Sequence, residues 1–224
     1  MAQRINPTVK RLSINKGWDS KWFDFSKYPQ FLEEDDLIRK TLQPILKKAN
    51  FKVVFIERKG NKINIIINTP KPGVIIKHKG EGIDEVKKLI EKSILKFRRK
   101  NNFDQEFQVS VNIEETRRPF TNARVVAGEI ASALERRMPG RRTIKTMLDK
   151  IMANKDVKGA KISISGRIDG VDIARKEWVK AGRMPLNTLR SNIDYANIFA
   201  LCTFGKIGIK VWIYKGDLLD NKIN

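Results

Sequence analysis

The sequence has 224 residues, 41% of them hydrophobic, and carries 46 lysines and arginines against 25 aspartates and glutamates, a formal net charge of +21. This length allows one large domain or two small ones, and the hydrophobic content is enough for a core, which excludes a wholly disordered chain. The charge indicates a polyanionic partner, with nucleic acid, an anionic membrane and an acidic protein as the candidates. The single cysteine and single histidine exclude an intramolecular disulfide, a structural zinc site and a metal site of paired histidines.

Neither rare residue is expected to be reactive. Cys202 lies in the apolar run IFALCTF, which favours a small core residue over a reactive thiol, and His78 lies in the polar run KPGVIIKHKGEG as a loop residue. The amino-terminal residues lack the apolar stretch of a signal peptide, and no segment approaches the roughly 20 apolar residues of a membrane span. We therefore expect a soluble intracellular protein that binds no metal and no cofactor.

Residues 1–32 are predicted to form a basic amino-terminal arm that is rich in turn formers and then in aromatic side chains. The aromatic residues are Trp18, Trp22, Phe23, Phe25, Tyr28 and Phe31. Their rings either pack onto the domain that follows or stack on a ligand, and packing is the more common use of such large apolar surfaces.

Residues 33–114 have the pattern of a compact α+β domain. The acidic residues 33–36 are typical of a helix amino terminus, and an apolar face from Ile38 to Ala49 continues that helix, although Pro44 is expected to kink it. The elements expected next are a strand hairpin over 52–68, a short helix, a basic loop at 77–80, a helix over 83–97 and a strand over 107–113. This order predicts a three-stranded sheet with helices on one face.

Residues 115–216 are predicted to form a second α+β domain with a mostly antiparallel sheet, followed by a polar tail over 217–224. Pro139 and Gly140 separate its first two helices, since these residues are common at helix boundaries. The expected elements are a helix over 122–138, a second helix that carries Ile144, Met147, Leu148 and Ile151, a strand over 160–165, a short helix around 171–180, and strands over 186–196, 197–204 and 207–214.

The strongest concentration of positive charge lies in residues 117–146. Acidic residues are scarce there, and the basic residues are Arg117, Arg118, Arg124, Arg136, Arg137, Arg141, Arg142 and Lys145. Guanidinium groups bond phosphate oxygens bidentately, which lysine cannot do, so this stretch predicts a phosphate-contacting surface. In a helix, Arg141 and Lys145 share one exposed face with Arg142 beside it, and the apolar residues occupy another arc.

Basic residues also occur in every other part of the chain. The loop at 77–80 and the helix after it combine side-chain charge with a helix amino terminus, which attracts phosphate. Other candidate contacts are Arg4, Lys10 and Arg11 in the arm, and Arg167, Arg175, Lys176, Lys180, Arg183 and Arg190 in the second domain. Such a wide distribution favours a large folded RNA over a small anionic substrate.

Several stretches of the chain now resemble a known family. The element order of residues 33–114 is similar to a type II KH domain, a module for single-stranded nucleic acid with a GXXG loop between two helices. Three segments closely resemble the third-protein family of the small ribosomal subunit, in its bacterial and organellar form: AQRINPTVKRLSINKGWDSKWF, GRIDGVDIARKEWVKAGRMPLNTLRSNIDYA and GKIGIKVWIYKG. The resemblance covers nearly the whole chain.

The resemblance implies a structural protein of the small-subunit head that is not an enzyme and binds small-subunit ribosomal RNA, in the bacterial cytoplasm or in an organelle. It implies that a basic RRxxK motif, matched here by Arg141, Arg142 and Lys145, lies at the channel through which messenger RNA enters. There the motif is associated with the unwinding of structured messenger RNA. The implied neighbours are small-subunit proteins ten and fourteen in the head, and proteins four and five around the channel.

One loop departs from the family pattern. Where the family has a loop similar to GKKG, this sequence has Lys77, His78, Lys79 and Gly80. The Lys77 side chain obstructs the close backbone approach that glycine allows, while it adds charge. The departure puts single-strand binding by this loop in question, but not its attraction for phosphate.

A stand-alone nucleic-acid-processing enzyme or an RNA-binding regulator is the alternative interpretation. No GxxxxGK[ST] loop is present, which excludes an ATP-driven helicase of that form. The carboxylates Asp169, Asp172 and Glu177 lie among basic residues, so ion pairing is favoured over metal binding. A membrane-surface protein is a weaker alternative, based on the lysine-rich helix of the first domain.

Overall fold

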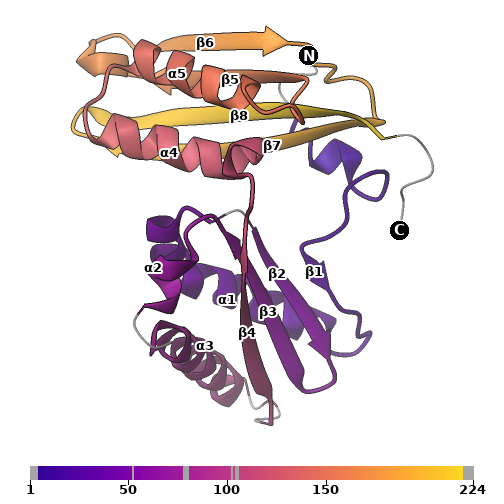
Figure 1. Cartoon of the computed structure of the whole chain (residues 1–224). Helices are drawn as coiled ribbons and strands as arrows, with labels where there is room; N and C mark the ends of the chain where they lie inside the picture. The colour runs from indigo at the N-terminus through magenta and orange to yellow at the C-terminus, as the bar shows by residue number, and fades with distance from the viewer. Residues whose placement is uncertain (1–4, 52, 78–80, 102, 104–105, 219–224) are drawn as a thin grey trace. The chain divides into compact units, whose positions relative to one another are not determined.

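The computed structural model describes residues 5–51, 53–77, 81–101, 103 and 106–218. The chain forms a first unit of residues 18–117 and a second unit of residues 1–17 together with 118–224, each with a hydrophobic core of its own (Figure 1). Residues 1–32, which the sequence predicted as one arm, are thus divided between the two units.

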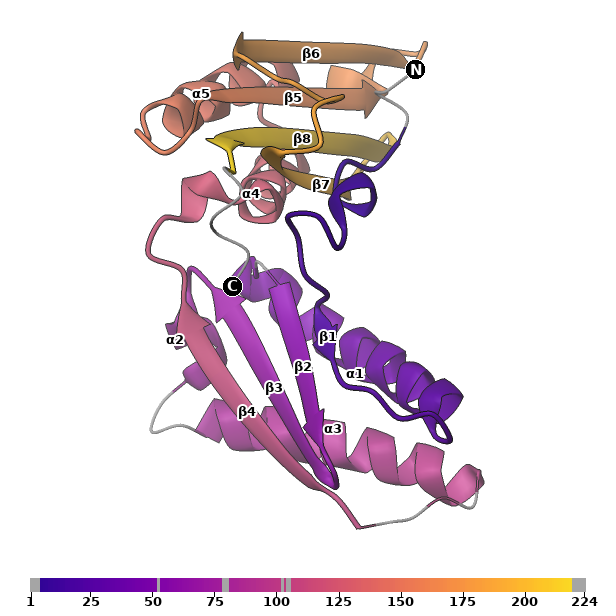
Figure 2. The same ribbon diagram turned by 90° about the vertical axis from the view of Figure 1, so that its right-hand side faces the viewer.

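The first unit contains a four-stranded sheet with helices on one face (Figure 2). Its elements are β1 (Ser20–Lys21), α1 (Tyr28–Ala49), β2 (Val53–Lys59), β3 (Lys62–Thr69), α2 (Pro72–Ile76), α3 (Glu81–Lys100) and β4 (Gln108–Glu115). The strand order is β1-β2-β3-β4, and of these pairs only β2 and β3 are antiparallel. The predicted α+β architecture is confirmed, with the short strand β1 added to the three strands expected.

The core of the first unit follows from the period of its apolar residues. In β3 every second residue, Ile63, Ile65 and Ile67, is buried, and the residues between them are only partly buried. A strand period of two turns these isoleucines to one face of the sheet. Helices α1 and α3 pack on that face through buried stripes that include Leu42 and Ile90.

Helix α1 begins earlier than the sequence indicated. It starts at Tyr28 rather than near Glu33, so the acidic residues lie inside the helix and not at its amino terminus. Glu34 and Asp35 are buried there, because they pair with basic side chains from other elements, and this pairing outweighs the helix-dipole preference. The helix continues through Pro44, whose side chain is exposed.

The second unit contains an antiparallel sheet of order β6-β5-β8-β7, with α4 and α5 on one face (Figure 1). Its strands and longer helices are α4 (Ala123–Glu135), α5 (Gly140–Met152), β5 (Gly159–Gly166), β6 (Arg175–Gly182), β7 (Ser191–Cys202) and β8 (Gly205–Asp217). Short 3₁₀ helices lie at Val9–Arg11, Pro119–Thr121 and Ile168–Gly170. The predicted second α+β domain is confirmed, and all of its described strand pairs are antiparallel.

Two local predictions for the second unit are wrong. Residues 175–182 form strand β6 rather than a short helix, because they pair with β5 along their whole length. Charged residues on an edge strand hide the apolar alternation by which strands are recognised. Strand β7 is continuous where the sequence indicated two strands, and the residues just before Ser191 form a loop.

Candidate nucleic-acid interface

The predicted phosphate-contacting residues of α5 lie on the surface. Arg141, Arg142 and Lys145 are exposed, whereas Ile144 and Met147 are buried in the core of the second unit. The helical period of 3.6 residues separates the two sets as the sequence analysis expected. The structure therefore brings three cations together on the first turns of one helix.

The turn between α4 and α5 adds two more cations. Arg136 and Arg137 are exposed, and Arg137 has a left-handed backbone conformation with φ 62°. In the described part of the chain, no carboxylate forms an ion pair with these two arginines or with Arg141, Arg142 and Lys145. Their charges are therefore available to phosphate groups, and we call these five residues the arginine cluster.

The start of α5 is held in place by the GRIDG segment. Asp169 Oδ1 accepts a hydrogen bond of 2.9 Å from the backbone N–H of Gly140. A Cβ atom at Gly140 would lie 2.7 Å from Cγ2 of Ile168, so glycine is needed for this close approach. These contacts fix the position of the first turn of α5, which carries Arg141 and Arg142 on the surface.

Other predicted basic contacts are exposed or paired with carboxylates. The ion pairs are Arg118 with Asp156, Arg167 with Asp172 at 3.0 Å, Arg175 with Glu177 at 3.0 Å and Arg190 with Asp217 at 3.6 Å. The pairing expected for Asp172 and Glu177 is thus observed. Further exposed basic residues are Lys10, Arg117, Arg124, Lys176, Lys180 and Arg183, and Arg4 lies outside the described residues.

Arg11 is not a surface residue and is withdrawn from the candidate RNA contacts. It is fully buried, and its guanidinium donates hydrogen bonds of 2.7–3.1 Å to the backbone carbonyls of Pro7, Leu186, Thr188 and Ser191. The guanidinium carries donors on three nitrogens, so one side chain can satisfy several loop carbonyls at once. Arg11 connects the amino-terminal segment to the loop before β7 through these hydrogen bonds. Its position in a basic run of the sequence gave no sign of this role.

The loop between α2 and α3 is only partly within the described residues. Lys77 follows α2 with φ 55° and ψ −161°, a backbone region that favours glycine. Its Nζ forms an exposed ion pair with Glu85. The other predicted loop residues, His78, Lys79 and Gly80, lie outside the described residues. A glycine at the first loop position, as in the GXXG pattern, would meet the backbone requirement without strain.

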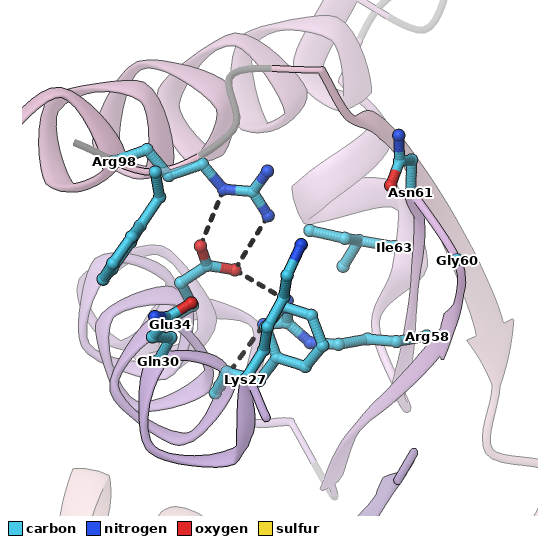
Figure 3. A pocket seen from close by; sticks show the side chains of 10 residues that line it. Lys27, Gln30, Glu34, Arg58, Gly60, Asn61, Ile63 and Arg98 are labelled. Atoms are coloured by element: carbon cyan, nitrogen blue, oxygen red, sulfur yellow. Dashed lines mark hydrogen bonds and ion pairs between the residues drawn. The ribbon is translucent and has the colours of Figure 1, made fainter. Parts of the chain in front are cut away.

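A buried network of charges, which the sequence analysis did not predict, lies in the first unit (Figure 3). Glu34 bridges two arginines, with Oε2 2.6 Å from Nη1 of Arg58 and Oε1 2.7 Å from Nε of Arg98. Asp35 Oδ1 lies 2.6 Å from Nη2 of Arg58. None of these four side chains belongs to a residue more than 8% exposed. The network joins α1, β2 and α3.

Aromatic side chains close over this network. Trp22 Nε1 donates a hydrogen bond of 2.8 Å to Asp35, and the guanidinium of Arg58 lies 4.6 Å from the ring centroid of Phe31. Cation–π contacts of this kind are stronger when they are shielded from water. A cavity of about 180 Å³ adjoins the network (Figure 3). Because its buried charges already bond one another, we interpret the network as structural.

The periods of the elements carried a signal for this network. Glu34 and Asp35 precede the buried Ile38 by four and three residues, which places them on the apolar face of α1. Arg58 continues the buried alternation of β2, and Arg98 follows a buried isoleucine of α3 by one helical turn. Charged residues at core positions are rarely buried unless paired, and matching opposite charges across elements would have found them.

The aromatic residues of the predicted arm have two different environments. Trp22 and Phe31 pack together in the network, with ring centroids 5.5 Å apart. Trp18, Phe23 and Phe25 are 64%, 83% and 89% exposed. Packing thus accounts for some of the rings, and those three are exposed.

The lone cysteine has the properties of a core residue. Cys202 is half-buried, and burial, followed by the nearby Glu135 carboxylate, raises the pKa of its thiol. A raised pKa leaves less reactive thiolate at neutral pH. Within the described residues, no group of three or more histidine, cysteine, aspartate or glutamate side chains could hold a metal ion. None of the described helices is both long and apolar enough to cross a membrane.

Comparison with known proteins identifies both units. A KH domain model matches residues 37–120, and a model of the C-terminal domain of ribosomal protein S3 matches residues 130–213. The small ribosomal subunit protein uS3 of Persephonella marina is 44% identical to the chain, over 98% of this chain and 92% of its own length. The chain belongs to the uS3 family of small ribosomal subunit proteins. The uS3 of Desulfovibrio desulfuricans is 41% identical over the full length of both chains.

Membership of the uS3 family assigns a domain type to each of the two units. The first unit is the KH domain, a class of module that binds RNA, and the second carries the arginine cluster within the S3 C-terminal domain. The uS3 family consists of structural proteins of the ribosome, so the prediction that this chain is not an enzyme is confirmed.

Proposed function

We propose that this uS3-family chain is a structural constituent of the small-subunit head, binds small-subunit ribosomal RNA and helps line the channel through which messenger RNA enters. The observation that carries the proposal is the arginine cluster, whose exposed cations have no acidic partner among the described residues. The formal net charge of +21 supports RNA as the partner, because a polyanion relieves the repulsion between so many cations.

The arginine cluster can favour unpaired messenger RNA in a simple way. Arg141 and Lys145 lie one helical turn apart on α5, so they can contact successive phosphates of a strand that passes along the helix. Contacts that form only with separated strands shift a hairpin toward its open form. The energy for unwinding comes from translocation by the ribosome, since the chain contains no phosphate-binding loop of the GxxxxGK[ST] type.

The remaining basic surfaces have supporting roles in this assignment. The exposed residues outside the arginine cluster bind ribosomal RNA phosphates, and the loop that begins at Lys77 adds charge without the close approach of a glycine loop. Small-subunit proteins ten and fourteen are the neighbours in the head, and proteins four and five lie around the channel. The site of action is the ribosome, in the bacterial cytoplasm or in an organelle.

Translation through a messenger hairpin tests the role of the arginine cluster. The triple variant Arg141→Ala, Arg142→Ala, Lys145→Ala should translate an unstructured message at the normal rate. It should translate the same message with a stable hairpin about fivefold more slowly, the effect of losing ~1 kcal/mol of strand binding. The measurement is the ratio of the two rates in a reconstituted system with sucrose-gradient-purified ribosomes.

A charge-matched variant provides the control. Lys88→Ala, Lys92→Ala, Lys96→Ala removes the same charge from the exposed side of α3 and should leave that ratio unchanged. Equal ratios for the arginine-cluster variant and the original protein would contradict the channel role. Absence of the chain from small subunits in the gradient would contradict the ribosomal assignment itself.

A further inference from the structure

The second unit's sheet has one face that is not covered by α4 and α5 (Figure 1). On the covered face, Ile162 and Ile164 of β5 pack in the same core as residues of both helices. Side chains alternate along a strand, so Lys161 and Ser163 of β5 point the other way. Paired residues of antiparallel strands share a face. This outer face therefore includes Lys161, Lys176, Trp178, Lys180, Phe199 and Lys210.

A loop covers one end of the outer face and leaves the other end exposed. Trp212 and Tyr214 of β8 are buried in a small cluster against Met184 and Leu186 of the loop before β7. Away from that cluster the exposure rises, and Trp178 on the edge strand β6 is 58% exposed. The chain thus buries part of the outer face with its own residues and not the remainder.

The exposed part of the outer face is positive. Lys176, Lys180 and Lys210 are exposed. Lys161 of β5 lies opposite Lys180 of β6 in the strand register. Burial, followed by repulsion from Lys176 and Lys180, lowers the pKa of Lys161. The one carboxylate of β6, Glu177, alternates to the covered face. An anion bound here would relieve the repulsion among Lys161, Lys176 and Lys180.

Flat apolar surfaces lie among these lysines. Trp178 and Phe199 are 58% and 60% exposed, one on each edge strand of the sheet. The strands between them present the small residues Ser163 and Gly208 together with Lys161 and Lys210. Three strand spacings separate β6 from β7, a distance of about 14 Å. Lys161 Nζ lies 5.2 Å from the Trp178 ring centroid, so charge and ring form one surface.

We propose that the outer face binds a single-stranded segment of RNA that crosses the sheet, with bases stacked on Trp178 and Phe199 and phosphates on the lysines of β5, β6 and β8. Exposed rings beside a positive surface are the features by which proteins hold single strands without reading sequence. This inference rests on the proposed RNA-binding function. It adds a second site on the strands β5 to β8, whereas the arginine cluster lies on α5 and the turn before it.

Binding of a labelled oligouridine to the full chain tests the stacking contact. Trp178→Ala should weaken binding about fivefold or more, since stacking of one base contributes about 5- to 150-fold. The control is Trp18→Ala, which removes an equally exposed ring from the first unit and should change affinity less than twofold. Equal affinities for the two variants would overturn the proposal.

The salt dependence of the same binding tests the lysines. The variant Lys176→Ala, Lys180→Ala, Lys210→Ala should reduce the slope of log K against log salt by about 2, because each phosphate contact to a single strand contributes about 0.7. An unchanged slope would overturn the proposal. This variant should leave the ratio of hairpin to unstructured translation unchanged, so failure here is distinguishable from failure of the channel role.

Photo-crosslinking in assembled small subunits identifies the occupant. A photoreactive phenylalanine analogue incorporated at Phe199 should give a covalent adduct to ribosomal RNA, which digestion and mass spectrometry would detect. An adduct to a ribosomal protein would mean that the outer face is a protein interface and would overturn the proposal. The absence of any adduct, with the chain present in the subunit, would do the same.

Discussion

Glu34 shows how one buried carboxylate can organise a domain. Its two oxygens accept hydrogen bonds from Arg58 and Arg98, and only 1% of the residue is exposed. Paired charges of this kind contribute little net stability compared with apolar residues of similar volume, but the loss of one partner leaves an uncompensated charge in the core. The two arginines come from different elements, so this single residue ties β2 and α3 to α1.

We therefore expect Glu34→Ala to destabilise the first unit by about 3–5 kcal/mol, because it leaves Arg98 buried without its carboxylate. Urea unfolding of the full chain, followed by tryptophan fluorescence, measures the change. The matched control is Asp36→Ala, which removes an exposed carboxylate that pairs with Lys40 and should cost less than about 0.5 kcal/mol. Similar unfolding midpoints for the two variants would show that the network is not a determinant of stability.

Lys77 occupies the position at which the GXXG pattern has its first glycine, and its backbone has a positive φ that glycine adopts without strain. A φ of 55° with ψ −161° costs a residue with a Cβ about 1–3 kcal/mol, whereas glycine adopts it freely. Lys77→Gly should raise the unfolding free energy by about 1 kcal/mol, after the entropy cost of glycine is subtracted. Lys71→Gly, at a negative φ of −128°, should not stabilise the protein. A loss of stability in Lys77→Gly would contradict this view of the loop.

At the scale of elements, the end of the β7–β8 pair depends on one carboxylate. Asp217 Oδ1 accepts hydrogen bonds from Ser191 Oγ at 2.6 Å and from Tyr214 Oη at 2.9 Å. The hydrogen bond from Ser191, followed by that from Tyr214, lowers the pKa of Asp217. These bonds join the first residue of β7 to the last residues of β8, beside the loop that Arg11 holds.

The lowered pKa gives a pH signature for this contact. The charged form of Asp217 is favoured in the folded state, so its stabilisation is complete above the unfolded pKa of about 3.9 and is lost as the pH falls through the folded value. Asp217→Asn should lower the melting temperature at pH 7, and the difference from the original protein should shrink below about pH 4. A difference that stays constant from pH 7 to pH 3 would rule out the ionised carboxylate as its source.

The sequence predicts correctly those helices and strands that have one clear apolar period. It does not predict those whose form depends on contacts with residues distant in the chain. The alternation in β3 and the apolar face of α5 identify both elements, because each buries one side against a core. For strand β6 the sequence predicts a helix, because the strand is rich in charged residues and its pairing with β5 cannot be seen in a short stretch of sequence. The contacts of Ser20 and Trp22 with Asp35 of α1 are likewise outside what an apolar period can show.

At the scale of the whole molecule, the excess positive charge is distributed unequally between roles. Arg11, Arg58 and Arg98 are buried and serve the fold. The arginine cluster and the outer face carry exposed cations that the chain does not neutralise with carboxylates of the same elements. The net charge of +21 is therefore not spread evenly over the surface. It is the sum of buried charges that stabilise the fold and exposed charges with other partners.

The sequence by itself determined the two α+β domains, the exposure of Arg141, Arg142 and Lys145, and the family, because periodicity and motifs are local properties of the chain. Only the tertiary structure decided which arginines are available to RNA. Arg11 and Arg141 both stand in basic runs, yet one is fully buried among carbonyl groups and the other is exposed. Arg11 is buried through partners that are distant in sequence, such as Ser191, and no local pattern around Arg11 encodes that contact.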